Sequence, residues 1–141
     1  MKLYDFIFCD DIRHEQNNKL SLMGLYSDRI IIQSNRMVSI KWPISIPLAL
    51  LLRFQIYTKD EKPDGFELEY FINKKLIANV HGKINEAKID IATFNLTVKN
   101  LGMPVEPGKL GFTVKLLKKN KFLYSETKEE AIEILHKAME A

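Results

Sequence analysis

The sequence has only one cysteine, few prolines and glycines, and no long apolar run. The single thiol, Cys9, rules out a disulfide within the chain. Five prolines and six glycines in 141 residues exclude a collagen-like or low-complexity protein. The longest apolar run, residues 48–52, is far shorter than the ~20 apolar residues that a membrane-spanning helix needs. We therefore expect one globular domain, for which 46% hydrophobic and 28% charged residues are ordinary values.

The charge balance and the first residues argue against further classes of protein. A net charge of +3 is too small to indicate a nucleic-acid partner by itself. Asp5 interrupts the first apolar stretch, and Asp10 and Asp11 end it, unlike the continuous apolar segment of a secretory signal. The sequence thus predicts a cytoplasmic protein with a reduced thiol and no membrane association.

Alternation of apolar and polar residues is the dominant pattern, and a period of two is typical of half-buried strands. In residues 48–56 the even positions are all apolar, whereas Arg53 and Gln55 fall on the opposite face. The same pattern predicts strands at residues 3–8, 20–26, 30–33, 66–72, 76–80, 94–98, 110–116 and 122–124, and a loop at residues 100–108. These short strands predict an all-β fold, an antiparallel β-sandwich of about seven to nine strands over residues 1–125.

The last segment, residues 126–141, has a helical pattern instead. Thr127 followed by Glu130 matches a capping box. The apolar residues that recur at helical spacing are Ala131, Ile134, Leu135 and Ala138. We expect an amphipathic C-terminal α-helix whose apolar stripe packs on the sandwich or on a partner.

Residues 42–47 form a second unusual segment, in which two prolines bracket alternating isoleucines. Such a segment is expected to be extended, with little capacity for ladder hydrogen bonds. An exposed tryptophan here would be an anchor for a protein partner. Together with the C-terminal stripe, the candidate partner surface consists of Trp42, Ile134, Leu135 and Met139.

Residues 9–15 bring a thiol, three carboxylates, a guanidinium and an imidazole close together in sequence. A nucleophilic Cys9 would need a general base, for which His14 is the nearest candidate. The neighbouring carboxylates would raise the thiol pKa rather than lower it, so we expect Cys9 to be a structural residue of a strand. Asp10 and Asp11 are then expected to end that strand by accepting hydrogen bonds from nearby backbone N–H groups.

A ligand or metal ion bound by this acidic cluster is the alternative. The groups available are Asp10, Asp11, His14 and Glu15, of which Asp10, Asp11 and Glu15 are the candidate metal ligands. Calcium prefers such oxygen ligands, and Asp28 could join them. A second acidic group is Asp60, Glu61 and Asp64. No loop matches a calcium-binding pattern, and one cysteine with three distant histidines is a poor zinc set. We expect no metal, no cofactor and no catalytic residue set.

The lysines near the last predicted hairpin allow a test of nucleic-acid binding. Lys115, Lys118, Lys119 and Lys121 lie close to Phe122 and Tyr124 in the sequence. Basic and aromatic side chains together can bind a single strand. A lysine-rich turn is equally ordinary on a solvated surface, and we expect no nucleic-acid partner.

The N-terminal string resembles an uncharacterised bacterial domain family. The residues that carry the resemblance are Cys9-Asp10-Asp11-Ile12-Arg13, Glu15 and the run from Lys19 to Tyr26, followed near the C-terminus by Pro107-Gly108 and the alternating strand after it. The resemblance implies a small β-sandwich from the inside of a bacterial cell, and it implies no activity. The expected C-terminal helix departs from the family's pattern.

Taken together, the sequence predicts a non-enzymatic β-sandwich that acts through protein–protein contacts or self-association. No catalytic set can be assembled from it, whereas edge strands, Trp42 and the C-terminal stripe offer surfaces. The alternative function is the ligand- or ion-binding sandwich described above.

Overall fold

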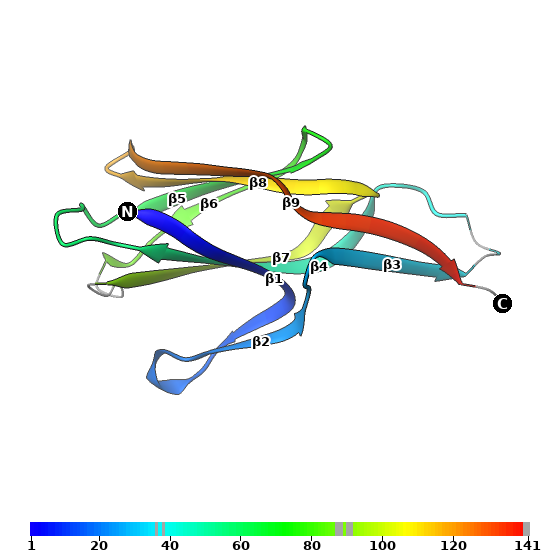
Figure 1. Cartoon of the computed structure of the whole chain (residues 1–141), viewed down its shortest axis with the longest axis horizontal. Coiled ribbons are helices and arrows are strands. Elements are labelled where there is room, and N and C mark those ends of the chain that lie inside the picture. The colour runs from blue at the N-terminus through cyan, green and yellow to red at the C-terminus, as the bar shows by residue number, and fades with distance from the viewer. Residues whose placement is uncertain (36, 38, 87–88, 90–91, 140–141) are drawn as a thin grey trace.

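The computed structural model describes residues 1–35, 37, 39–86, 89 and 92–139. The described residues form nine strands in two stacked sheets (Figure 1). The four-stranded sheet has the order β2-β1-β4-β7 and the five-stranded sheet the order β3-β9-β8-β5-β6. The strands are β1 (Lys2–His14), β2 (Leu20–Leu25), β3 (Arg29–Asn35), β4 (Ile44–Gln55), β5 (Gly65–Ile72), β6 (Lys75–Lys83), β7 (Thr93–Val105), β8 (Gly108–Lys118) and β9 (Lys121–Met139). The all-β prediction is confirmed, and the two sheets are consistent with a β-sandwich.

The core lies between the two sheets, where the alternating apolar residues of each sheet meet. Leu48, Leu50 and Leu52 of β4 are each no more than 1% exposed. On the facing sheet, Phe112 of β8 and Tyr70 of β5 are fully buried. The period of two read from the sequence therefore marks the buried face correctly, because successive residues of a strand point to opposite faces.

Helical elements are nearly absent from the described part of the chain. They comprise the short 3₁₀ turn η1 (Gln16–Asn18), which joins β1 to β2, and a 3₁₀ conformation at Glu86. None of the described residues belongs to a helix with the length and apolar character needed to cross a membrane.

The predicted C-terminal helix is wrong, because this segment is the long strand β9. Its first part pairs antiparallel with β8, and its last part pairs parallel with β3. Ile132 and Ile134 alternate into the core and are at most 3% exposed. An isolated helix of ~13 residues is marginal in water, so pairing with two strands and burial of two isoleucines outweigh the capping box.

Two predicted strand ends are also wrong. β1 does not stop at Asp10 and Asp11 but continues to His14, because β2 supplies it with a partner from Cys9 onward. β7 extends through most of the predicted loop at residues 100–108, pairing with β4 as far as Val105. Pro104 is tolerated there because β7 is an edge strand, where a missing N–H costs no ladder bond.

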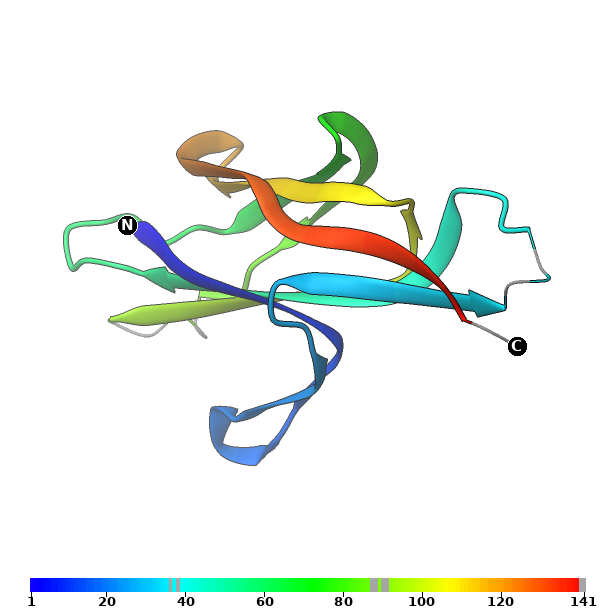
Figure 2. The same ribbon diagram turned by 45° about the vertical axis from the view of Figure 1, so that its right-hand side comes forward.

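The last part of β1 and the whole of β2 form a hairpin that projects from the sandwich (Figure 2). A second apolar cluster lies at its base, separate from the main core. It is formed by Cys9, Ile12, Ala49 and Leu51, all no more than 4% exposed. This small cluster explains why both faces of β4 are apolar in its middle part.

Candidate functional site

The structure separates the acidic residues of the predicted ligand site. Tyr26 Oη donates a hydrogen bond to Asp10 Oδ1 at 2.5 Å. Asp11 instead pairs with Lys99 Nζ of β7 at 3.2 Å, and this contact lowers the pKa of the Asp11 carboxyl. The two neighbouring carboxylates therefore have different partners.

His14 and Glu15 also have partners of their own. His14 Nε2 lies 3.2 Å from Thr97 Oγ1, and Ser21 Oγ donates to Glu15 Oε1 at 3.1 Å. Within the described ranges, no three or more His, Cys, Asp or Glu residues come together in a group that could hold a metal ion. The structure thus does not assemble the four residues into one site.

In the second acidic group, the carboxylates of Asp60 and Asp64 also bind other groups of the protein. Asp60 Oδ2 lies 2.7 Å from the N-terminal ammonium of Met1, which lowers the pKa of the Asp60 carboxyl. Asp64 accepts a hydrogen bond from the backbone N–H of Lys119. These contacts fasten the turn to the first residue and to the last hairpin.

Cys9 is fully buried and lies at the base of the projecting hairpin. Burial, with a smaller contribution from the charge of Asp10, raises the pKa of its thiol. Its Sγ donates to the carbonyl oxygen of Asp11 at 3.4 Å. A buried thiol with a raised pKa is a poor nucleophile.

The four predicted partner-surface residues lie in different environments. Ile134 is wrong as a surface residue, since β9 turns it into the core, where it is 0% exposed. Trp42 is half-buried, with its ring 5.3 Å from that of His136 in an edge-to-face contact. Leu135 is half-buried, and Met139 is the last residue of β9, where its side chain lies outside the described part.

The lysines of the last hairpin are distributed over several contacts. Lys115 Nζ pairs with Glu69 at 3.2 Å and also lies 5.5 Å from the centre of the Phe122 ring. Lys118 pairs with Glu86. Phe122 is 66% exposed, whereas Tyr124 packs its ring against Phe54. The two aromatic rings therefore do not form one exposed platform.

A different feature combines free backbone and apolar side chains, and we call it the open side of the sandwich. β2 pairs with β1 only from Cys9 onward, so the first part of β1 has β4 on one side and, in the described part of the chain, no strand on the other. β3 pairs with β9 only from Glu133 onward, so the first part of β9 is likewise unpaired opposite β8. Both unpaired edges lie on the same side of the molecule (Figure 1).

The open side is closed at one end by a contact between the sheets and at the other by the chain segment that connects them. At one end the backbone N–H of Leu3 donates to Tyr124 Oη at 3.0 Å. At the other end the chain crosses from β2 to β3. There, Tyr26 N–H donates to the carbonyl of Phe8, and Glu133 N–H donates to that of Asp28. Between these ends, β1 and β9 face each other without backbone pairing.

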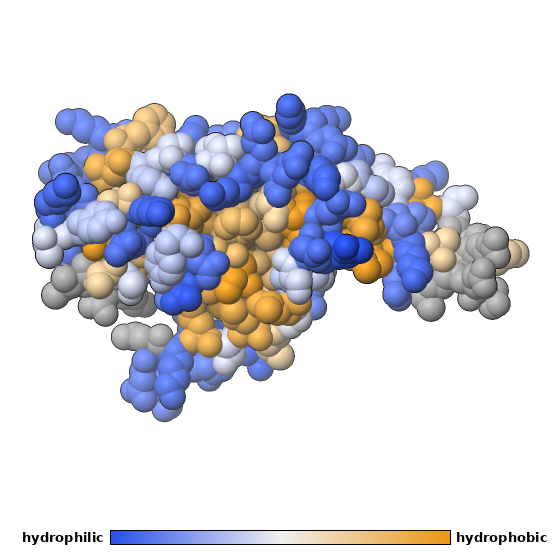
Figure 3. All heavy atoms as spheres, in the orientation of Figure 1, coloured by the Kyte–Doolittle hydropathy of each residue, from blue (hydrophilic) through white to orange (hydrophobic). Residues whose placement is uncertain are grey.

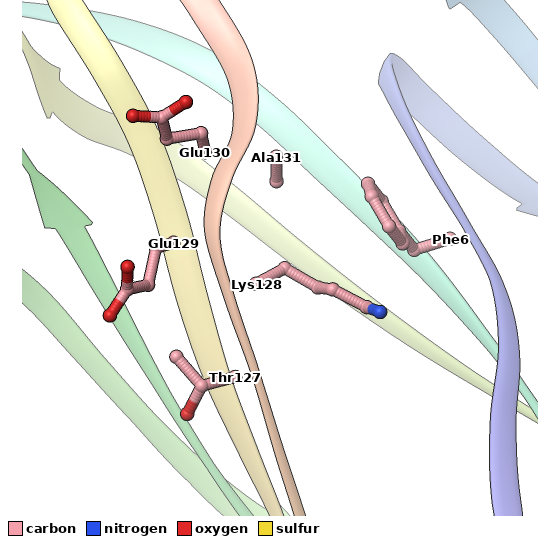
Figure 4. Close-up of a pocket in the computed structure, with 6 residues that line it drawn as sticks. All are labelled: Phe6, Thr127, Lys128, Glu129, Glu130 and Ala131. Atoms are coloured by element: carbon pink, nitrogen blue, oxygen red, sulfur yellow. The ribbon is translucent and has the colours of Figure 1, made fainter.

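A groove of about 430 Å³ lies between the two edges. It is lined by Phe6, Thr127, Lys128, Glu129, Glu130 and Ala131. Phe6 extends from β1 toward β9, while Lys128 and Ala131 extend from β9 toward Phe6 (Figure 4). The carboxylates of Glu129 and Glu130 point to the opposite side of β9 (Figure 4). Apolar side chains gather in the middle of this face (Figure 3).

The shape of the groove depends on a bulge in β9. The pairing moves from Phe112–Lys128 to Leu110–Ile132, so β9 advances four residues while β8 advances two. A Cβ atom on Gly111 would lie 2.3 Å from the carbonyl oxygen of Glu129, so only glycine lets β9 pass this closely. Bulges commonly redirect side chains at binding sites.

The sequence patterns did not indicate Phe6, Lys128 or Ala131 as site residues. In the sequence, Phe6 is one more apolar residue of a strand, and Lys128 falls in the first turn of the expected helix. The available signal was Gly111, a residue without a side chain inside an otherwise regular strand, which is typical of a bulge or a close backbone approach.

A comparison with known proteins found no protein-family model and no curated protein that matches this chain. The resemblance of the N-terminal string to a bacterial domain family therefore stays a prediction. The case for a function depends on the geometry of the open side alone.

Proposed function

We propose that this chain is a non-enzymatic binding module that takes up an extended segment of another protein on its open side. The observation that supports this is that two strands with unpaired edges, β1 and β9, face each other across a groove lined by an apolar residue, Phe6. An extended segment that adds to a free sheet edge gains main-chain hydrogen bonds, and side-chain pockets supply specificity.

The edge of β1 offers backbone groups in the right direction. The carbonyl of Phe8 accepts a hydrogen bond from Tyr26, so the backbone groups of Phe8 point away from β4. Because alternate residues of a strand point the same way, the N–H and carbonyl of Phe6 also point into the groove. An added strand would continue the line of β2 along β1.

The groove also indicates the chemistry of its occupant. Phe6 and Ala131 favour an apolar side chain, since the Phe6 ring already packs on Phe112 with its centre 5.2 Å away. Lys128 Nζ lies 3.3 Å from Glu126, a partly exposed pair that a partner carboxylate can replace at little cost. The expected occupant is therefore an extended segment with an apolar and an acidic side chain.

Two further observations support a binding role over catalysis. The thiol is buried with a raised pKa, and the imidazole of His14 bonds to Thr97 rather than to Cys9. The cytoplasmic location stays a prediction from the sequence.

A photo-crosslinking amino acid at position 128, introduced into the full chain in its native host, tests the proposal. The matched control places the same group at Lys75, an exposed lysine on the edge strand β6. We expect a specific crosslinked segment from position 128 and none from position 75. Equal crosslinking to the same proteins from both positions would contradict the proposal.

The crosslinked segment, made as a synthetic peptide, then allows a quantitative test. Lys128→Glu is expected to weaken its binding about tenfold, which corresponds to ~1.4 kcal/mol. Lys75→Glu makes the same charge change elsewhere and is expected to leave the affinity unchanged. A peptide that binds wild type and Lys128→Glu equally would count against the groove.

A further inference from the structure

The ends of β3 and β9 form a two-stranded ribbon that continues past the sandwich (Figure 1). The pairing of β8 with β9 stops at Ile134, whereas the parallel pairing of β3 with β9 continues as far as Met139. Parallel pairs normally occur inside sheets that are covered on both faces, and an isolated two-stranded ribbon is marginal in water. This ribbon therefore lacks the neighbours that such a pair usually has.

One face of the ribbon is covered by the chain itself and the other is not. On the inner face, Ser34 Oγ lies 2.6 Å from His136 Nε2, and the ring of Trp42 packs against that of His136. On the outer face, the paired residues Ile31 and Leu135 are side by side, and Ile31 is 47% exposed. The outer face thus has an apolar pair at its centre.

β3 has fewer features that discourage pairing than the other edge strands of the described residues, since its single charged residue, Arg29, lies at its first position. Edge strands usually carry lysine, proline or a distortion that blocks the addition of another strand. β6 has a lysine at each end, β7 contains Lys99 and Pro104, and β2 is short and contains Gly24 with φ of 67°. The interior of β3 is uncharged and contains three consecutive isoleucines.

We propose that β3 pairs antiparallel with β3 of a second copy of this chain, joining two five-stranded sheets into one. A two-fold axis perpendicular to the sheet keeps each side chain on its own face of the sheet. The axis must therefore lie midway between the two copies of one residue, which then face each other. With the axis at Ile31, Ile31 meets Ile31 of the second copy and Ile30 meets Ile32. The outer face then carries a continuous apolar row of Leu135, Ile31 and the same two residues from the second copy.

This register brings no like charges together. Arg29 lies beside Glu133 in β9 of its own chain and would face the neutral Gln33 of the second copy. No like charges stand directly opposite each other, a pairing that would destabilise an antiparallel sheet. Moving the axis to Ile32 would place Ile30 opposite Ser34 and Ile31 opposite Gln33, which leaves Ile32 facing Ile32 as the only isoleucine pair. The surface is separate from the groove on the open side, so either proposal can fail alone.

Sedimentation velocity of the purified full chain between about 1 and 200 μM tests the association, a range that covers micromolar affinities. We expect a dimer that forms with rising concentration in the wild type and a monomer in Ile31→Lys, which places two ammonium groups on the axis. The matched control is Leu76→Lys, which changes a residue 51% exposed on the edge strand β6 of the same sheet. It is expected to dimerise like the wild type. A wild type that stays monomeric, or a dimer that Leu76→Lys rather than Ile31→Lys disrupts, would overturn the proposal.

A cysteine at position 31 tests the register. Cβ atoms of directly opposed residues in an antiparallel pair lie about 4.5–5.5 Å apart, close enough for a disulfide after small adjustments. Because Cys9 is 0% exposed, the new thiol is the only reactive one in the native chain. We expect Ile31→Cys to oxidise to a covalent dimer at concentrations where Leu76→Cys stays monomeric. Equal crosslinking of the two variants would contradict the proposed pairing.

Discussion

The two halves of β9 belong to one strand but have different surroundings. The first half pairs antiparallel with β8, contains the bulge opposite Gly111 and leaves its other edge to the groove. The second half pairs parallel with β3 and continues beyond the sandwich. Ile132 and Ile134, at the junction, are both in the core.

The two sets of surroundings indicate which part of β9 contributes to stability and which part is available for association. Along the first half, stability comes from burial between the sheets, and the free edge opens onto an apolar groove. Along the second half, few side chains are buried beyond Ile134. Substitutions beside the first half should therefore change the free energy of unfolding, and those in the second half should mainly change association.

The largest loss of the free energy of unfolding is expected when a large core side chain beneath the first half of β9 is shortened. Phe112 is 0% exposed and contacts the rings of Phe6 and Phe8, so Phe112→Ala should lower the free energy of unfolding by about 3–5 kcal/mol. Leu135→Ala, in the ribbon, should cost less than ~1 kcal/mol. Urea denaturation at low protein concentration measures both, and equal losses would remove the distinction between the two halves.

A smaller loss of the free energy of unfolding is expected when a methyl group is added at Gly111, beneath the bulge of β9. Gly111→Ala forces its Cβ against the carbonyls of Lys128 and Glu129, and overpacking of this kind costs about 1–3 kcal/mol. Gly65→Ala is the matched control, because its Cβ would meet only the carbonyl of Gly82 at 3.4 Å. If thermal unfolding shows the two variants to be equally stable, the bulge does not need a glycine.

Alkaline pH should weaken the crossing between β2 and β3, which closes one end of the open side. Burial and the hydrogen bond to Asp10 raise the pKa of Tyr26 to about 12, from 10.0. The unfolded chain thus loses this proton first, and the stability that Tyr26 contributes is lost as the pH rises from 10 to about 12. Tyr70 and Tyr124 also have raised pKa values, so Tyr26→Phe should reduce this fall and not abolish it. An unchanged slope of stability against pH in Tyr26→Phe would refute this.

The smallest effect is expected for an ion pair at the junction of the two halves. Lys109 Nζ lies 2.5 Å from Glu133, and this contact raises the pKa of the Lys109 ammonium. Because both side chains are more than a third exposed, Glu133→Gln should lower the stability only slightly, and the difference should shrink in 1 M salt. A salt-independent loss of several kcal/mol would show that the junction is held in another way.

The sequence was sufficient to predict the strands of the sandwich body, because one face of each is buried and the period of two follows from that burial. In β4, β5 and β8, the apolar alternate residues are the core residues. β9 could not be read in the same way. Its bulge breaks the alternation, so that Ala131, Ile134 and Leu135 fall at helical spacing although they belong to a strand.

The candidate site could not be predicted from the sequence, for a related reason. A free edge arises from which strands fail to pair, and this depends on sheet order, which no local pattern contains. Phe6 is a groove residue only because β2 begins its pairing at Cys9. Conversely, Asp10, Asp11, His14 and Glu15 are neighbours in sequence, but the projecting hairpin gives each a different partner.

Amide hydrogen exchange at single-residue resolution tests whether the open side has an unpaired backbone edge. Phe6 N–H points into the groove, whereas the N–H of Ile7 points toward its partner Leu51 in β4. We predict fast exchange at Phe6 and strong protection at Ile7 in the free protein, with Phe6 becoming protected when the crosslinked segment binds. Equal protection of both amides in the free protein would contradict the account.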